Sequence, residues 1–320
     1  MPIVFRSGQR SKQERIHQYV GNQLNSSYGG ATISSIDLNV VDAAVSGGQG
    51  VKPYSYTFTS FDYSPASVVT VASGLNDSGT LLGYAEDSMA NYTFFTLTNG
   101  QYTVITPPAG ILGLTVIPAI NNSGQVVGSY SSDASGARTG FIGYNGQYTL
   151  IQPQGAFATY GLGINDAGQA GGYYYYFIGS QLVFRSYLYN RGTFGLISYP
   201  GYPNDTLAFS INANSDIAGI YGGSQGFYIV NGNFHRFSAG AAYYTAVAGI
   251  NADEMLTGDY YKLGSGGIYS GFVYQQGIVS TVNYPGATST VWLGINNEGV
   301  LAGYYLDIYY HIHGAIATPN

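Results

Sequence analysis

The chain has 320 residues, 10 Lys and Arg against 16 Asp and Glu, a formal net charge of −6 and no cysteine. So few basic residues argue against nucleic acid as a partner, and the lack of cysteine excludes disulfides, thiol catalysis and Cys-ligated metal sites. With 47 glycines, 33 tyrosines, 8% charged residues and no apolar run of membrane-spanning length, the composition favours a β-rich fold with many tight turns and no membrane span.

Residues 1–53 form an N-terminal extension that lacks the repeat described below. A capping-box pattern begins at Ser11, and apolar residues recur every four positions from Ile16 to Leu24, so we predict one amphipathic helix over 12–24. This extension is either an arm for self-association or, as we favour, a helix packed on the following domain or a tail. Its basic residues are not followed by a continuous apolar stretch, so it does not resemble a secretory signal.

Residues 54–320 contain one spacing pattern six times: an Asn with a Thr six positions before it and a Gly seven positions after it. The Asn residues are Asn76, Asn121, Asn165, Asn212, Asn251 and Asn296. Their successive intervals of 45, 44, 47, 39 and 45 residues lie in the range of four-stranded propeller blades.

Each pattern predicts a strand, a tight turn and a second strand. Residues between the Thr and the Asn alternate between a small and a bulky face, as in a strand packed between two neighbours. The Asn is expected to hold the turn through backbone N–H groups, and a Gly three positions later suits a left-handed turn residue. Ser215 and Glu254 replace that Gly, so we expect those two turns to differ.

A second hairpin follows in each complete repeat, which makes four strands per repeat. Its turns are Asn99-Gly100, Asn145-Gly146, Asn190-Arg191-Gly192, Asn231-Gly232 and Gln276-Gly277. The sixth repeat ends one strand short, and a strand at 55–62 matches the missing fourth position. We therefore predict an all-β fold, a six-bladed β-propeller of four-stranded blades whose last blade takes three strands from the C-terminus and one from 55–62.

The pattern "INDxGxxxGxY … GFxYxxGxFTxI … PGA … TxAxGIN" resembles the HAF-type bacterial extracellular repeat over residues 55–320. This resemblance implies a tandem-repeat protein located outside the cell or at its surface, and it implies no defined reaction. A cytoplasmic location is also open, because the sequence shows no export signal.

The connections between second and third strands, and those between repeats, are long and variable, and loops that vary on a rigid scaffold commonly bind ligands. We expect the ligand on this variable face, where Tyr173–Tyr176 would begin one connection. Tyrosines recur nine positions after five of the six repeat Asn residues, and in the first repeat Ala85 takes this position with Tyr84 beside it. Such a row suits stacking on sugar rings, although Tyr also packs well between blades. The candidate ligand-binding residues are Tyr84, Tyr130, Tyr174, Tyr221, Tyr260, Tyr305, Asp133, Asp259 and Asp307.

Metal and catalytic motifs are weak in this sequence, and we predict no cofactor, no metal site and no catalytic residue. The turns at Asn121 and Asn212 carry only neutral side chains at their early positions, which argues against calcium in every repeat. His311 and His313 share one strand face and could begin a zinc site, but no third ligand is identifiable, so a structural pair is favoured.

Three functions remain open. The favoured hypothesis is a non-enzymatic, lectin-like binding protein for carbohydrate or another polyhydroxylated ligand. The first alternative is a hydrolase or lyase with acidic residues at a central pocket, drawn from Glu86, Asp87, Asp133, Asp205, Asp259 and Asp307. The second is a self-assembling or adhesive surface protein that uses the Tyr-rich rims and residues 1–53.

Overall fold

The computed structural model describes residues 55–106, 108, 116–131, 135–240, 242, 244–262 and 264–320. These residues belong to one compact unit that begins at Ser55. Every regular element among them is a β-strand, and none of them forms a helix that could span a membrane. The helix predicted over 12–24 lies outside the described residues.

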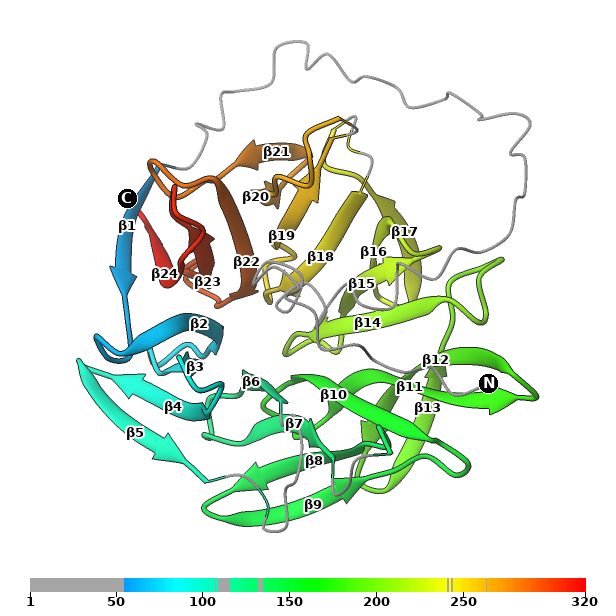
Figure 1. The fold of residues 1–320 in the computed structure, drawn as a ribbon. Coiled ribbons are helices and arrows are strands. Elements are labelled where there is room, and N and C mark those ends of the chain that lie inside the picture. Colours follow the sequence, from blue (N-terminus) through cyan, green and yellow to red (C-terminus); the bar gives the residue numbers. More distant parts are fainter. Residues whose placement is uncertain are drawn as a thin grey trace. The chain divides into compact units, whose positions relative to one another are not determined.

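The described residues form a β-propeller, whose sheets follow one another around a common axis (Figure 1). Four sheets contain four antiparallel strands each. The first two contain β6 (Val116–Ile120), β7 (Val126–Tyr130), β8 (Thr139–Tyr144) and β9 (Gln147–Ile151), then β10 (Ala158–Ile164), β11 (Ala170–Ile178), β12 (Gln181–Asn190) and β13 (Thr193–Ile197). The other two contain β14 (Thr206–Ile211), β15 (Ile217–Tyr221), β16 (Gln225–Val230) and β17 (Asn233–Phe237), then β18 (Tyr244–Ile250), β19 (Leu256–Tyr261), β20 (Ser270–Gln275) and β21 (Ile278–Thr281). Tyr173–Tyr176 lie within β11 and not in a connection.

The fifth sheet has eight strands and joins the two ends of the propeller. It contains β22 (Ser289–Ile295), β23 (Leu301–Leu306), β24 (Ile312–Pro319), β1 (Tyr56–Phe61), β2 (Ser67–Leu75), β3 (Leu81–Asp87), β4 (Tyr92–Thr98) and β5 (Gln101–Ile105). β1 pairs antiparallel with β24, so the strand expected at 55–62 extends the sheet of the last three strands. The six separate sheets predicted from the sequence are not observed, because one parallel pair, Val69 with Ile312, joins the first and last groups of strands.

The six repeat Asn side chains are buried and connect the repeats in a closed ring. Each Oδ1 accepts the backbone N–H four residues later, at 2.8–3.0 Å, which fixes the turn. Each Nδ2 donates to the backbone carbonyl of the Asn in the next repeat, at 2.8–3.3 Å. The last of these bonds runs from Asn296 back to Asn76, so one side chain both caps its own turn and links neighbouring sheets.

The two turns that lack the expected Gly adopt the same conformation as the others. Ser215 and Glu254 have φ values of 67° and 59°, close to the 73° of Gly168. The prediction that these turns would differ is therefore wrong. The Asn side chain holds the turn through hydrogen bonds, and this stabilises a left-handed residue even where a side chain makes that conformation less favourable.

The Gly that recurs seven positions after each repeat Asn is required for a steric reason. A β-bulge in each inner strand shifts the register, for example between Ala208 and Ser210, and brings a backbone carbonyl against the second strand. A Cβ atom on Gly219 would lie 2.0 Å from the carbonyl oxygen of Leu207, and one on Gly172 would lie 1.9 Å from that of Tyr160. Only Gly leaves room for this approach.

The repeat Thr also has a structural role that the spacing alone did not reveal. Among the described residues its side chain is buried, and in four repeats, at Thr70, Thr206, Thr245 and Thr290, its Oγ1 accepts a backbone N–H from the segment that enters the repeat. Such bonds run from Tyr199 to Thr206 at 2.9 Å and from Tyr284 to Thr290 at 3.0 Å. In these four repeats the Thr therefore fixes the segment that leads into the inner strand.

Candidate functional site

The connections between second and third strands lie at the same end of the sheets as the links between repeats. Backbone hydrogen bonds join the start of an inner strand to the start of the third strand of the preceding sheet. They run from Thr245 N to Ser224 O at 3.0 Å and from Thr290 N to Tyr269 O at 3.1 Å. The tight Asn turns and the third-to-fourth turns lie at the opposite end, so the variable loops share one face. We call it the loop face.

The loop face carries large apolar side chains that are exposed to solvent. They lie in or beside the connections between second and third strands, and one lies in a link: Met89, Tyr92, Phe177, Ile178, Leu182, Tyr202, Ile268, Ile308, Tyr309 and Tyr310. Tyr309 is 72% exposed and Phe177 is 50% exposed. Sequence reasoning did not select these residues as site residues, although the aromatic composition of the long connections was the signal that could have found them.

The predicted row of tyrosines does not gather at one place. Each member packs into a hydrophobic core between neighbouring sheets: Tyr84 and Tyr130 in one, and Tyr174, Tyr221, Tyr260 and Tyr305 in four others. Tyr221 is 5% exposed, and its ring stacks on that of Tyr199 with the centroids 3.6 Å apart. The geometry matches the alternative that Tyr packs between blades.

The hydroxyl groups of two row members reach the outer strands of their own sheets. Tyr260 Oη lies 2.8 Å from Thr281 Oγ1 in β21, and Tyr305 Oη lies 3.0 Å from Ser60 Oγ in β1. Burial raises the pKa of Tyr84 well above its ordinary value. The Tyr84 phenol is therefore neutral at physiological pH, and the tyrosines of the row act as packing groups with a polar tip.

The three predicted aspartates have different surroundings. Asp133 lies outside the described residues. Asp259 in β19 is only 4% exposed, its Oδ2 has no hydrogen-bond partner among the described residues, and burial raises its pKa to about 8. Asp307 follows β23 on the loop face, where its Oδ1 accepts the backbone N–H groups of Tyr309 and His311, both at 2.8 Å. Of the two aspartates that the structure describes, Asp307 is the one placed to contact a ligand.

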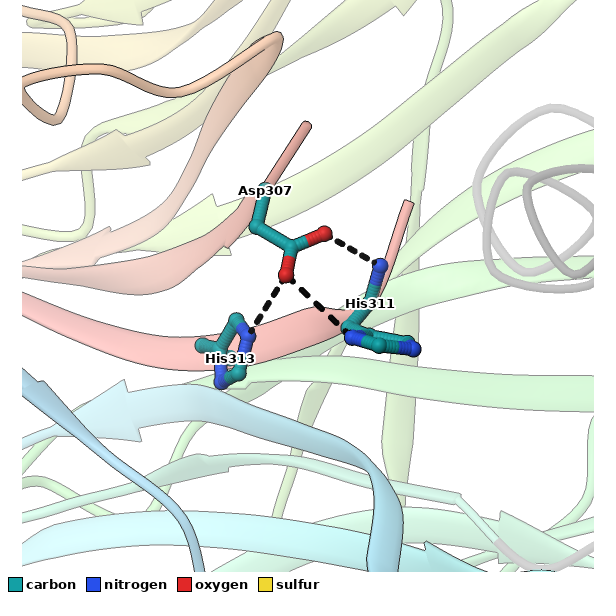
Figure 2. A group of neighbouring side chains, drawn as sticks. All are labelled: Asp307, His311 and His313. Atoms are coloured by element: carbon teal, nitrogen blue, oxygen red, sulfur yellow. Dashed lines mark hydrogen bonds and ion pairs between the residues drawn. The ribbon is translucent and has the colours of Figure 1, made fainter. Parts of the chain in front are cut away.

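Asp307 lies against the two histidines that the sequence grouped as a pair (Figure 2). Its Oδ2 is 3.2 Å from Nδ1 of His311 and 3.6 Å from Nε2 of His313. The other ring nitrogen of His313 lies 3.0 Å from the carboxylate of Asp62, which follows β1. The structure therefore supplies the third group that sequence reasoning did not identify, from a hairpin connection four residues before His311.

A cavity of about 110 Å³ lies where the inner strands of the propeller end, around the Asn ring. Asp77 and Asp166 are the carboxylates in its lining. Asn122 donates to both of them at 2.7 Å, so they are held in hydrogen bonds between neighbouring turns. None of the described acids proposed for a hydrolase or lyase lines this cavity: Glu86, Asp87, Asp205, Asp259 and Asp307.

No protein-family model and no curated protein sequence matches this chain. Solved structures with a similar fold include a mutant of AofleA from Arthrobotrys oligospora, which has 11% sequence identity and a TM-score of 0.47 and matches 82% of this chain and 86% of that chain. TolB from Acinetobacter baumannii has 14% identity and a TM-score of 0.47 over 72% of this chain and 60% of that chain. A six-bladed, fucose-recognising lectin from Aleuria aurantia has 10% identity and a TM-score of 0.43 over 78% of this chain and 94% of that chain.

Proposed function

We propose that this protein is a binding protein for carbohydrate or another neutral polyhydroxylated ligand, and that the ligand binds on the loop face. The observation that carries the proposal is the set of exposed aromatic side chains on the connections of that face, with Tyr309 and Tyr310 next to each other. Exposed apolar side chains that gather on one face often mark a binding site, and aromatic faces stack well on the C–H surfaces of sugars.

The proposed contact residues, Tyr309 and Tyr310, do not belong to the tyrosine row predicted from the sequence. The row members are engaged in packing between sheets, whereas Tyr309 and Tyr310 are 72% and 55% exposed. Their loop is held by the hydrogen bonds of Asp307, so the rings project from a fixed turn. A fixed turn reduces the conformational entropy that is lost when a ligand binds.

Four finer predictions from the sequence remain proposals. We count the eight-stranded sheet as two blades, which makes six, because a single residue pair joins its halves and each half carries one Asn of the ring. Membership of the HAF-type repeat family stays a prediction, and so does a location outside the cell. Self-association through residues 1–53 stays open as well.

A glycan-array screen of the full-length protein tests the proposal, followed by calorimetric titration of any ligand found. We expect the double variant Tyr309→Ala/Tyr310→Ala to lose binding. Tyr144→Ala is a matched control, because Tyr144 is 49% exposed at the end of β8, before a third-to-fourth turn on the opposite face.

Absence of binding to every glycan, or equal loss of binding in both variants, would refute the proposal. Mass spectrometry of the bound glycans after incubation tests the alternative of a hydrolase or lyase, which predicts shortened products. Particle size with and without residues 1–53 tests the alternative of a self-assembling protein, which predicts that oligomers disappear on truncation.

A further inference from the structure

We propose that Asp307, His311 and His313 bind a divalent transition-metal ion of the zinc class at the connection between β23 and β24. This proposal is independent of the proposed function. It rests on the convergence of three ligand atoms, on the groups that orient them and on a second loop with the same turn and no histidines.

The three ligand atoms are already close to the spacing that a metal requires. Asp307 Oδ2 lies 3.2 Å from His311 Nδ1 and 3.6 Å from His313 Nε2, and all three atoms lie within 4.8 Å of one another. In a tetrahedral zinc site with bonds of about 2.0–2.1 Å, ligand atoms are separated by roughly 3.4 Å. Small rotations of these side chains, of which His311 is exposed and the other two are partly buried, would therefore complete the site (Figure 2).

Neighbouring groups fix the orientation of His313. Its Nδ1 lies 3.0 Å from both carboxylate oxygens of Asp62, which leaves Nε2 directed at Asp307. Its ring stacks on Tyr305, with the centroids 5.1 Å apart, and Tyr305 in turn stacks on Tyr284. In zinc sites, a metal-binding histidine commonly donates a hydrogen bond from its second ring nitrogen to a carboxylate, which orients the ring.

The carboxylate of Asp307 is oriented in a similar way. Its Oδ1 accepts the N–H groups of Tyr309 and His311, so its Oδ2 is the oxygen that faces both imidazoles. The two oxygens therefore have separate roles: one holds the turn and the other is available to a metal. Carboxylate oxygen and imidazole nitrogen are both common zinc ligands.

The loop between β3 and β4 forms the same turn without histidine. Asp87 Oδ1 accepts the N–H groups of Met89 and Asn91, and Asn91 Nδ2 donates to Asp87 Oδ2 at 2.9 Å. Asn91 corresponds to His311, and Thr93 corresponds to His313. The turn therefore does not need an imidazole to form, and the two histidines add a function that the turn itself does not require.

A bound ion would also link the two ends of the propeller. Asp62 follows β1, and it would act through His313 of β24, whose pairing with β1 joins the beginning and the end of residues 55–320. Three protein ligands leave a fourth position open to water or to a bound molecule. The ion should therefore stabilise the folded state in proportion to its binding.

Isothermal titration with Zn²⁺ of the full-length protein, carrying no polyhistidine tag, tests the proposal. We expect one ion per chain and a melting temperature that rises with Zn²⁺ and falls again with a chelator. His311→Asn reproduces the turn of the Asp87 loop and should keep the fold while weakening affinity at least about tenfold. Asp62→Asn should weaken affinity about 10- to 100-fold by releasing His313.

Three control variants make the test specific. His235→Ala changes a histidine that stacks on Tyr228 in another sheet, Asp87→Asn changes the corresponding turn, and His17→Ala changes the one remaining histidine of the chain. All three should bind Zn²⁺ as the wild type does. Absence of saturable binding, unchanged binding in His311→Asn, or loss of binding in His17→Ala would overturn the proposal and leave the cluster as pairs of histidine and aspartate side chains.

Discussion

Asp259 makes the stability of the propeller depend on pH, and Asp259→Asn should remove that dependence. The side chain is buried beside Tyr244, Tyr269 and Tyr304, and burial raises its pKa from 3.8 to about 8. The folded protein therefore keeps this carboxyl protonated at neutral pH, whereas the unfolded chain ionises it. The contribution of the protonated group to stability is complete below about pH 3.8 and is lost as the pH rises towards 8.

The size of the effect follows from the shift in pKa. Between the two pKa values, a single such group lowers the free energy of unfolding by about 1.4 kcal/mol per pH unit. From about pH 5 to about pH 8 this amounts to about 4 kcal/mol, over three pH units. Asn cannot ionise and has nearly the shape of a protonated carboxyl, so Asp259→Asn should gain about 4 kcal/mol relative to the wild type across this range.

Urea denaturation at about pH 5, 6, 7 and 8 measures this difference. All other residues are the same in the two proteins, so their contributions cancel in the comparison. Asp253→Asn, an exposed change in the turn before β19, should follow the wild-type curve. Parallel curves for wild type and Asp259→Asn would refute the reasoning, because they would mean that the buried carboxyl has the same pKa in the folded and unfolded states.

Three further changes test the ring and the turns by thermal or urea denaturation. Asn165→Ala should cost about 2–4 kcal/mol, because it removes the side-chain hydrogen bonds that hold its own turn and one of the two donors to the buried carbonyl of Asn212 in the next repeat. A cost below about 0.5 kcal/mol would contradict the role of the ring. Gly219→Ala should destabilise the protein by more than about 2 kcal/mol, because the added Cβ would clash with a backbone carbonyl. Gly195→Ala is the control: its Cβ would meet only an oxygen at 3.8 Å, and it should change stability by less than about 1 kcal/mol. Equal effects of the two substitutions would refute the steric argument. Glu254→Gly should stabilise the protein by up to about 1 kcal/mol, because Glu254 occupies a left-handed conformation that Gly adopts more easily. A loss of stability would show that a contact of the Glu254 side chain outweighs this backbone strain.

The repeated elements were predictable because each is determined by local chemistry. The Asn, the alternating strands and the two-residue turns are visible in the sequence, and they placed the strands, the tight turns and the closing strand at 55–62. The merging of two strand groups into one sheet was not predictable, since it depends on a single pair, Val69 with Ile312, between distant parts of the chain.

The candidate site was less predictable, because it depends on which side chains the packing leaves exposed. The tyrosine row repeats regularly, and it repeats because the cores between sheets repeat. Tyr309 and Tyr310 follow no period, since they lie in a connection that differs from repeat to repeat. Asp62 and His313 are 251 residues apart, and only the pairing of β1 with β24 brings them together.

Hydrogen exchange of the protein with and without its best-bound glycan tests the central claim, recognition on the loop face, most directly. We expect slower exchange in the connections at 87–92, 177–182 and 307–311, and no change in the tight Asn turns at the opposite end. Protection confined to the Asn turns around the central cavity would contradict the account and would place the ligand on the other face.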